Sequence, residues 1–256
     1  MKDPLGDRMK NYYEEVSKTK LVRRMPVIIR LDGKSFHTFT HNFHKPFDEV
    51  FMAAMQLTMK SLCENIQGCV LGYTQSDEIT LVLTDYAKLT TSAWYDYEVQ
   101  KMCSVSAAMA TLYFNRHFSD EVNKVTSGKT TDEMPKEWKD YFLARDKGAV
   151  FDSRCFNVPK EEVTNCVYWR QKDAERNSVN SVAQSLYSHK ELQGISTHDL
   201  VVKMEQEKGL IWGNLPNDQK RGSCCIKQDG KWIIDHNIPQ FKNEDRSYIE
   251  NLIKTE

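Results

Sequence analysis

Residues 69–83 read CVLGYTQSDEITLVL, and this stretch decides the fold. Two apolar runs, 69–73 and 79–83, flank the polar segment TQSDE, which is the pattern of two strands joined by a tight turn. The upstream segment MPVIIRL at 25–31 is short, apolar and β-branched, and it predicts another buried strand. The core is therefore expected to form around a sheet that contains these three strands.

Helices are expected between and after these strands. Apolar residues recur at helical spacing over about 47–67, where Asp48 follows Pro46 as a start signal, and again over about 92–118. A further strand is expected at about 149–158. The order strand, helix, strand, strand, helix, strand is the split βαβ pattern of ferredoxin-like sheets. The predicted fold class is α/β (α+β), an antiparallel sheet with helices on one face and an appended C-terminal lobe.

This topology has a consequence for chemistry. The first two strands of such a sheet are parallel, and the third inserts between them, antiparallel to both. Asp32, which follows the first strand, should therefore lie beside Asp77 in the turn between the second and third strands. The plainer interpretation is that Asp32 and Gly33 only make a turn and that Asp77 only marks a hairpin tip.

Two domains are expected without a linker between them. The first spans 1–158, with a polar insertion at about 119–148 that contains a possible short helix at 135–145. The second, 159–256, is a helical lobe with a hairpin, packed on the first. Its expected elements are helices at 160–186 and 198–207 and a hairpin formed by 223–227 and 232–235.

The composition is that of an ordinary globular protein, with 256 residues, 40% of them hydrophobic and 28% charged. No apolar run approaches the roughly 20 residues of a membrane helix, and the first residues do not form a signal peptide. Seven cysteines without a CxxC spacing argue against a disulfide framework and a zinc ribbon. We therefore expect a cytoplasmic protein with no membrane partner.

The net charge of −1 means that any nucleic-acid binding must come from local basic patches. Basic residues gather in three places: Lys18, Lys20, Arg23 and Arg24; Arg170, Lys172 and Arg176; and Lys220 with Arg221. Single clusters of this kind are usually solvated faces, but three of them are compatible with a phosphate-bearing partner.

Paired acidic residues at a sheet edge suit two-metal phosphoryl transfer. Magnesium prefers carboxylate and carbonyl oxygens and leaves positions for phosphates and water. Two ions about 3.5–4 Å apart can activate the attacking hydroxyl and stabilise the leaving pyrophosphate. Asp32 and Asp77 are the candidate bridging ligands, with the carbonyl of Gly33 as a further ligand and Glu78 in support.

Three histidines, His37, His41 and His44, lie in the loop after Asp32, close to Lys45. A zinc site would need a fourth ligand, and no neighbouring cysteine pair offers one. Contact between a histidine and a nucleotide phosphate is more natural, while His41 and His44 fit ordinary surface positions. Lys45 is a candidate point charge for a triphosphate, or else a surface lysine.

The segment YWRQ at 168–171 lies on an expected helix. An apolar Tyr/Trp pair in a helix is usually part of the core. Arg170 and Arg176, six positions apart, are candidates for holding phosphates or following a nucleic-acid backbone.

Four motifs in this order resemble the tRNA(His) guanylyltransferase family of 3′–5′ polymerases, and more closely its guanylyltransferase-like branch in bacteria and archaea. They are RLDGKSFHTF at 30–39, YTQSDE at 73–78, FDSRCFNVP at 151–159 and WRQKDAERNS at 169–178. The resemblance covers roughly 12–188 and is looser in the C-terminal lobe.

The resemblance implies a polymerase-type palm and a reaction at the 5′ end of RNA. ATP would first activate a 5′-monophosphate to an adenylylated end, and the 3′-hydroxyl of an incoming nucleotide, typically GTP, would then displace AMP. A 5′-triphosphate end would need no activation. The cofactors implied are two Mg²⁺ ions, with ATP and GTP or another nucleoside triphosphate as substrates. The implied partner is tRNA, and the family is usually tetrameric.

The resemblance also assigns roles to residues. Asp32, Gly33 and Asp77 match the metal ligands, and Glu78 matches the acidic residue beside them. The nucleotide-binding set is Lys34, Ser35, Phe36, His37, Lys45 and Ser76. Asp152 and Arg154 match a DSR-type segment, and Trp169, Arg170, Gln171 and Asp173 match a WRQ-D segment. Candidates for RNA or phosphate binding are Lys101, Arg154, Arg170, Arg176, Asn177, Lys220 and Arg221.

Two departures from the family pattern bear on the substrate. Where eukaryotic members carry HINN, linked to addition of G−1 to tRNA(His), this chain has ERNS at 175–178. A double arginine of the family is replaced by Tyr97 and Glu98, although Lys101 fits. Template-dependent repair of 5′-truncated tRNA is therefore expected rather than an obligatory role on tRNA(His). Two alternatives stay open: a palm-type nucleotide cyclase and a non-catalytic RNA-binding protein.

Overall fold

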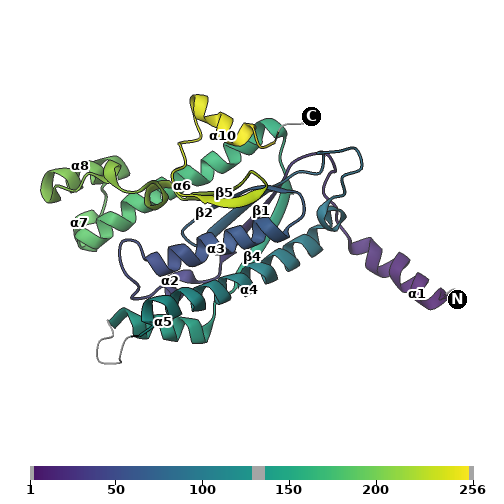
Figure 1. Ribbon diagram of the computed structural model, residues 1–256, viewed down its shortest axis with the longest axis horizontal. Helices are drawn as coiled ribbons and strands as arrows, with labels where there is room; N and C mark the ends of the chain where they lie inside the picture. Colours follow the sequence, from purple (N-terminus) through teal and green to yellow (C-terminus); the bar gives the residue numbers. More distant parts are fainter. Residues whose placement is uncertain (1–2, 129–135, 254–256) are drawn as a thin grey trace.

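The computed structural model describes residues 3–128 and 136–253 (Figure 1). Its centre is a six-stranded antiparallel sheet with the strand order β4-β1-β3-β2-β5-β6. The strands are β1 (Val27–Gly33), β2 (Cys69–Gln75), β3 (Glu78–Leu83), β4 (Phe151–Asn157), β5 (Ser223–Gln228) and β6 (Lys231–Asp235).

The predicted split βαβ topology is confirmed. Strand β3 lies between β1 and β2 and runs antiparallel to both, and β4 pairs with the other edge of β1. The predicted C-terminal hairpin is also present, as β5 and β6. Its position differs from a lobe packed on the sheet, because β5 pairs with the free edge of β2, where Leu71 lies opposite Ile226. The hairpin therefore extends the sheet itself.

One face of the sheet is covered by α3 (Glu49–Asn65) and α4 (Val99–Thr126), which pack against alternate residues of β1 such as Ile29 and Leu31 (Figure 1). Asp48 caps α3 as predicted, and its carboxylate accepts a hydrogen bond from the Phe51 N–H at 2.8 Å.

Helix α4 differs from its expected bounds at both ends. A short 3₁₀ segment, Trp94–Tyr97, precedes it, and the helix then continues to Thr126. Residues 119–126 are thus helical rather than irregular, because Val122 continues the buried stripe of Phe114 and Phe118. Helix α5 (Lys136–Lys147) packs against α4. It corresponds to the short helix expected at 135–145 and ends two residues later; residue 135 lies outside the described part.

The opposite face of the sheet packs against α6 (Val163–Leu186) and the C-terminal segment with α10 (Ser247–Glu250). Ile28 and Val82, whose side chains alternate with those of the first face, form this second core with Val163 and Val167. Helices thus cover both faces: α3 and α4 on one, and α6 from the C-terminal part on the other. This places α6 over the face on which Asp32 also points.

Beyond the sheet, α6 packs against α8 (Thr197–Lys208) through a third apolar cluster that includes Val179, Val182 and Met204. The remaining helices and helical turns are α1 (Pro4–Met9), the π-helical Lys10–Glu14, Glu15–Ser17, α2 (Phe36–Phe39), Lys160–Glu162, α7 (His189–Leu192), Trp212–Asn214, α9 (Asn217–Arg221) and Asn243–Arg246. Of the helices in the described ranges, none has the length and apolar character that crossing a membrane requires.

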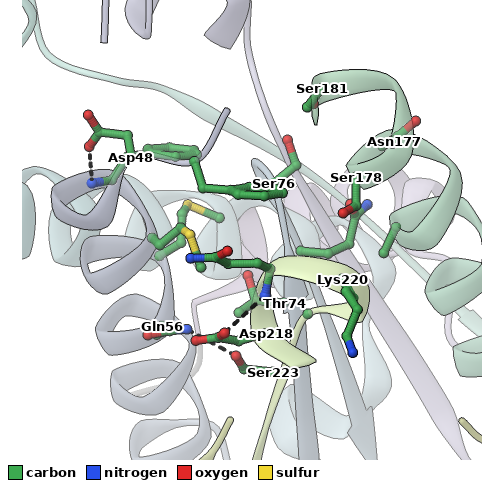
Figure 2. Close-up of a pocket in the computed structure, with 18 of the residues that line it drawn as sticks. Asp48, Gln56, Thr74, Ser76, Asn177, Ser178, Ser181, Asp218, Lys220 and Ser223 are labelled. Atoms are coloured by element: carbon green, nitrogen blue, oxygen red, sulfur yellow. Dashed lines mark hydrogen bonds between the residues drawn. The ribbon is translucent and has the colours of Figure 1, made fainter. Parts of the chain in front are cut away.

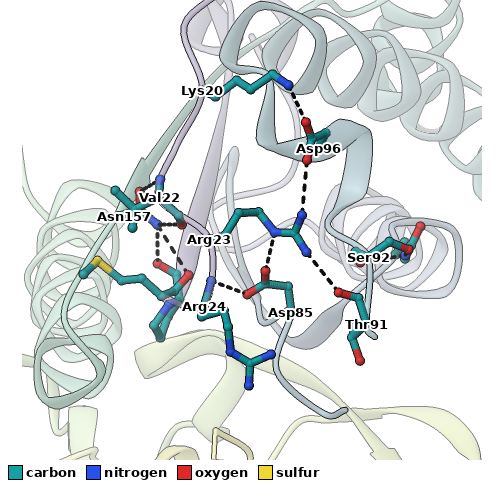
Figure 3. Close-up of polar contacts among 12 residues, drawn as sticks. Lys20, Val22, Arg23, Arg24, Asp85, Thr91, Ser92, Asp96 and Asn157 are labelled. Atoms are coloured by element: carbon teal, nitrogen blue, oxygen red, sulfur yellow. Dashed lines mark hydrogen bonds and ion pairs between the residues drawn. The ribbon is translucent and has the colours of Figure 1, made fainter. Parts of the chain in front are cut away.

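The first basic cluster of the sequence serves the fold. The guanidinium group of Arg23 donates to the buried carboxylate of Asp85 at 2.6 Å and to Asp96 at 3.2 Å (Figure 3). Asp85 also accepts from the backbone N–H of Arg24 at 2.8 Å, and Lys20 pairs with Asp96. These contacts fasten the segment before β1 to the loop after β3, so the charges of Lys20 and Arg23 are already engaged.

Candidate active site

Asp32 and Asp77 meet at one edge of the sheet. Asp32 stands near the end of β1, opposite Glu78 of β3 and Asp152 of β4. The backbone N–H of Gly33 donates to the carbonyl oxygen of Asp77 at 3.1 Å, which fixes the β2–β3 turn beside the end of β1. The sheet topology thus brings the two aspartates together as the order of elements predicts.

The β2–β3 turn holds Asp77 in a defined conformation. Gln75 and Glu78 are paired across the turn, so only Ser76 and Asp77 form the loop. Of these two, only Ser76 has a positive φ, of 49°, which is the pattern of a type II′ turn whose first central residue is normally glycine. The Ser76 hydroxyl donates to Asp77 Oδ1 at 3.1 Å. A serine held in this backbone region is a local strain of the kind found at functional sites.

The electrostatics of the pair suit a cation. Burial raises the pKa of the Asp77 carboxyl, the negative charge of Asp32 raises it further, and His37 acts in the opposite direction. The two aspartates are therefore close enough to repel each other, and a divalent cation between them would relieve that repulsion. Within the described ranges, no three His, Cys, Asp or Glu side chains cluster closely enough to hold an ion alone. Any ion here would need carbonyl, phosphate or water oxygens as well, as Mg²⁺ commonly does.

Glu78 is committed to another contact. Its Oε1 accepts from Arg170 Nε of α6 at 2.6 Å, and the two residues are only 6% and 8% exposed. Arg170 also donates to Asp173 at 2.9 Å. The pair lies on the same sheet face as Asp32, and it fastens α6 above the acidic edge. Glu78 and Arg170 therefore hold α6 against the sheet beside the site.

The loop after Asp32 rests on an aromatic core. A Cβ atom at Gly33 would lie 2.3 Å from the ring of Phe36, so only glycine permits this approach. Phe36 is buried and its ring packs against four others, those of Phe39, Phe51, Phe114 and Phe151. Phe36, expected to bind nucleotide, therefore anchors the loop instead, because its ring is turned into the core.

The other loop residues expected to bind nucleotide are exposed. Lys34 is fixed through its backbone N–H, which donates to the Val150 carbonyl at 2.8 Å, while its side chain is exposed. Ser35 and His37 are also exposed, and His37 lies close enough to influence Asp77. Lys45 lines a separate depression near the C-terminal half of α6. The loop thus leaves the side chains of Lys34, Ser35 and His37 exposed near the acidic pair, while Lys45 lies farther along it.

A pocket of about 150 Å³ opens beside the turn, between the start of α3, the β2–β3 turn, α6 and α9 (Figure 2). Ser76 lies at one wall and Asn177 and Ser178 of α6 at another, as Figure 2 shows. Its lining combines apolar and polar side chains. The apolar residues are Phe47, Phe51, Met52 and Met55, and the polar ones include Gln56, Thr74, Asp218, Lys220 and Ser223.

Most of these pocket residues carry no signal in the sequence. Met52 and Met55 follow the helical spacing of α3 and look like ordinary core residues. Gln56 offers the single hint, since a buried glutamine in an apolar stripe needs a partner, and its amide donates to the Ser223 hydroxyl at 3.0 Å.

The residues expected to bind RNA are scattered. Lys101 lies two residues before Cys103 on α4, and Cys103 contacts Cys155 of β4. Cys155 stands opposite Ile29 of β1, which is three residues before Asp32. Three residues of strand span about 10 Å, so Lys101 belongs to the opposite end of the sheet. Lys220 is 8% exposed, and its ammonium group donates to the Gly213 carbonyl at 2.5 Å. The structure thus keeps Lys220 off the outer surface.

The remaining basic candidates are paired with acids. Arg154 donates to Asp152 at 2.9 Å, Arg176 pairs with Asp173, and Arg221 Nε lies 3.4 Å from Glu175. Arg154 nevertheless stands opposite Arg30, two residues from Asp32 and on the same sheet face. Arg154 and Arg176 keep exposed side chains, and Asn177 lines the pocket.

Trp169 is a residue that sequence reasoning misplaced. The interpretation of the Tyr/Trp pair as core is wrong for Trp169, which is 52% exposed. Its ring lies 5.5 Å from the Arg30 guanidinium carbon and 4.5 Å from that of Arg170. Helix α6 turns Arg170 toward the sheet, so its neighbour Trp169 points out to the rim of the site.

The fold and this site define a palm-type nucleotidyltransferase: an antiparallel split βαβ sheet with an acidic pair at its edge and a polar pocket beside it. The family model of tRNAHis guanylyltransferase (Thg1) matches residues 6–159, more than half of the chain. The chain belongs to the tRNA(His) guanylyltransferase family, whose members are nucleotidyltransferases that process tRNA.

Solved structures and relatives agree. A bacterial tRNA(His) guanylyltransferase (Thg1)-like protein in complex with ATP is 41% identical, with a TM-score of 0.83 over 97% of this chain and 99% of that one. A bacterial Thg1-like protein in complex with GTP is 37% identical, with a TM-score of 0.74 over the same shares. A probable tRNA(His) guanylyltransferase of Dictyostelium discoideum is 23% identical over 223 residues, covering 81% of this chain and 77% of its own.

Proposed function

We propose that this protein adds nucleotides in the 3′–5′ direction to the 5′ end of tRNA, using the opposite strand as template, and so repairs truncated 5′ ends. The observation that carries the proposal is the meeting of Asp32 and Asp77 at one edge of the sheet, next to Ser76, which lines a pocket. Membership in the family and the ATP and GTP bound by the similar bacterial proteins support a nucleoside triphosphate as the second substrate.

The acidic pair fits two Mg²⁺ ions held by the carboxylates of Asp32 and Asp77 and the carbonyl of Gly33. Bound there, the ions would activate the attacking hydroxyl and stabilise charge on the leaving phosphate. The pKa of Asp77, raised first by burial and further by the negative charge of Asp32, supports this assignment together with the meeting of the two residues at the sheet edge.

The chain's own groups then orient the substrates. The pocket beside Ser76 offers apolar side chains for the faces of a base and amide and hydroxyl groups for its edge. Exposed Lys45 directly precedes Pro46, which lines the pocket, and supplies positive charge for a triphosphate; exposed His37 lies near Asp77 and offers a ring nitrogen to a phosphate. In the activation step a 5′-monophosphate oxygen attacks the α-phosphorus of ATP and pyrophosphate leaves. In the addition step the 3′-hydroxyl of the incoming nucleotide attacks the activated 5′-phosphorus and AMP leaves.

Template dependence is proposed because the segment that accompanies non-templated addition to tRNA(His) is replaced by ERNS at 175–178. In the structure Asn177 and Ser178 line the pocket, Arg176 pairs with Asp173, and Glu175 lies near Arg221. This leaves base pairing with the acceptor strand as the means of choosing the nucleotide. A cytoplasmic location and a homo-tetramer are part of the same proposal.

The test is an assay with labelled 5′-truncated tRNAs whose opposite strands differ in sequence. Addition of the complementary nucleotide in each case is expected, with no product from GTP alone. Formation of a cyclic product from GTP without RNA would favour the palm-type cyclase. Addition of G irrespective of the opposite base would overturn the template-dependent role, and RNA binding without any product would favour a non-catalytic protein.

A further inference from the structure

Trp169 is exposed next to the site, and the proposed chemistry does not use it. It stands on α6 with 52% of its surface open to solvent, and its indole N–H makes no hydrogen bond within the described residues. Its ring lies beside the guanidinium groups of Arg30 and Arg170.

The surroundings of Trp169 are cationic. Arg30 lies on β1, opposite Arg154 and two residues before Asp32, so both arginines point to the same face of the sheet as the acidic pair. Arg30 makes no ion pair with any described residue, and its buried Nε lacks a hydrogen-bond partner. A guanidinium group without an acidic partner can bind a phosphate, and the exposed indole beside it can stack on a base. Together they favour a partner that carries both phosphates and aromatic bases.

A groove continues from Trp169 between α6 and α8. On α6 it is lined by Trp169, Lys172 and Arg176, which are spaced three and four residues apart and therefore share one face of the helix. His198 of α8 and the ring of Trp212 line the other side. From 169 to 179 the helix rises about 15 Å, enough for a few nucleotides of a single strand.

The acids in this groove are already neutralised. Asp173 is bonded to Arg170 and Arg176, and Glu175 lies 3.4 Å from Arg221. Lys172 has no acidic partner among the described residues. The surface therefore combines free positive charge with aromatic rings, the combination by which proteins hold single-stranded nucleic acid.

We propose that Trp169 is a stacking platform for an unpaired base of the RNA, and that the α6–α8 groove carries the strand away from the site. The inference rests on the proposed function, in which a truncated 5′ end leaves the opposite strand unpaired. A nucleoside triphosphate is a poorer occupant, because the groove is open along its length whereas the pocket beside Ser76 is enclosed on several sides.

The experiment measures RNA binding without nucleotide. A 5′-truncated tRNA with an unpaired opposite strand is added to the wild type, Trp169→Phe, Trp169→Ala and the control Trp232→Phe, which changes a tryptophan on the far edge strand β6. Trp169→Ala is expected to weaken binding about tenfold or more, the loss of one base–aromatic stack, while Trp169→Phe keeps most of the affinity. RNA should quench the tryptophan fluorescence of the wild type and the control more than that of Trp169→Phe, in which Trp212 of the same groove still responds.

Two further readouts separate stacking from a structural role. The KM for the nucleoside triphosphate should be unchanged in Trp169→Ala, and its unfolding midpoint should stay near that of the wild type because the side chain is half exposed. Lys172→Ala is expected to reduce the salt dependence of RNA binding, since it removes a phosphate contact. A change of oligomeric state in Trp169→Ala, detected by light scattering, would overturn the inference in favour of a subunit contact.

Equal RNA affinity in Trp169→Ala and wild type, or equal quenching in Trp169→Phe and wild type, would also overturn the inference while leaving nucleotide addition untouched. A wild-type protein that shows the quenching but adds no nucleotide would support the platform and overturn the proposed function instead.

Discussion

Glu78 of β3 and Arg170 of α6 form a buried ion pair, with 2.6 Å between Glu78 Oε1 and Arg170 Nε. The pair links the sheet to α6, and Glu78 directly follows Asp77 in the chain. Together with the apolar contacts of Val163 and Val167, the pair holds α6, with Trp169 and Asn177, beside the acidic edge. Its strength is open to measurement.

Arg170→Ala is expected to lower the free energy of unfolding by about 3 kcal/mol, because it leaves the Glu78 carboxylate buried without its partner. Urea denaturation of the wild type, Arg170→Ala, Glu78→Gln and the double variant Glu78→Gln/Arg170→Ala gives the coupling energy. The double variant should lose less stability than the sum of the two single ones. Strict additivity would show that the two side chains do not depend on each other.

Asp32→Ala and Asp77→Ala are each expected to reduce nucleotide addition by about 10³-fold or more, since charge stabilisation by bound metal is worth several kcal/mol and each 1.4 kcal/mol is a factor of ten. Both variants should remain folded, because removing one of two repelling carboxylates does not weaken the metal-free protein. Asp146→Asn, an exposed aspartate on α5, is the control. Normal addition by either alanine variant would contradict the assigned site.

The raised pKa of Asp77 predicts a response of stability to pH. Because burial and the charge of Asp32 favour the protonated form in the folded chain, the ionised carboxylate destabilises the fold at neutral pH. Asp77→Asn should therefore stabilise the metal-free protein at neutral pH. The gain should shrink as the pH falls through the raised pKa and disappear below the pKa of the unfolded chain. Urea denaturation with a chelator, at neutral and acidic pH, measures it.

Lys45→Ala is expected to raise the KM for the nucleoside triphosphate more than it lowers kcat, if Lys45 binds phosphate in the ground state. Steady-state kinetics with GTP as the varied substrate measures both constants. Lys147→Ala removes another exposed lysine, at the end of α5, and should change neither. A fall in kcat at unchanged KM in Lys45→Ala would instead mean that Lys45 stabilises the transition state rather than the bound nucleotide.

Gly72→Ala tests the packing of α3 on the sheet. A Cβ atom at Gly72 would lie 2.5 Å from Cys63 Sγ and 2.8 Å from Met59 Cγ, inside a closely packed core. The expected loss of stability is roughly 1–3 kcal/mol, typical of overpacking. Gly213→Ala is the matched control, because a Cβ there meets no atom within 4 Å. Equal unfolding midpoints for both variants would mean that α3 shifts to accommodate the added methyl group without loss of stability.

Much of the architecture could be predicted from local patterns. The sequence predicted the apolar runs of β1, β2 and β3 and the helical stripe of α3 with its Asp48 cap. Hydrophobic period and helix capping are local properties, so they can be recognised in a short stretch of sequence. The connection rules for a split βαβ unit then placed Asp32 beside Asp77. Bounds were less certain where the pattern faded, so α4 extends to Thr126 through a stretch of polar composition.

The sequence by itself thus determined the order of the elements and the convergence of the two aspartates, since both follow from short-range periodicity and from the few ways strands can be connected. Only the tertiary structure decided that Phe36 turns into the core, that Glu78 is bound by Arg170, that the C-terminal hairpin joins the free edge of β2, and that Trp169 faces solvent. Those outcomes depend on which distant surfaces pack together, and packing between remote segments has no local signature in the chain.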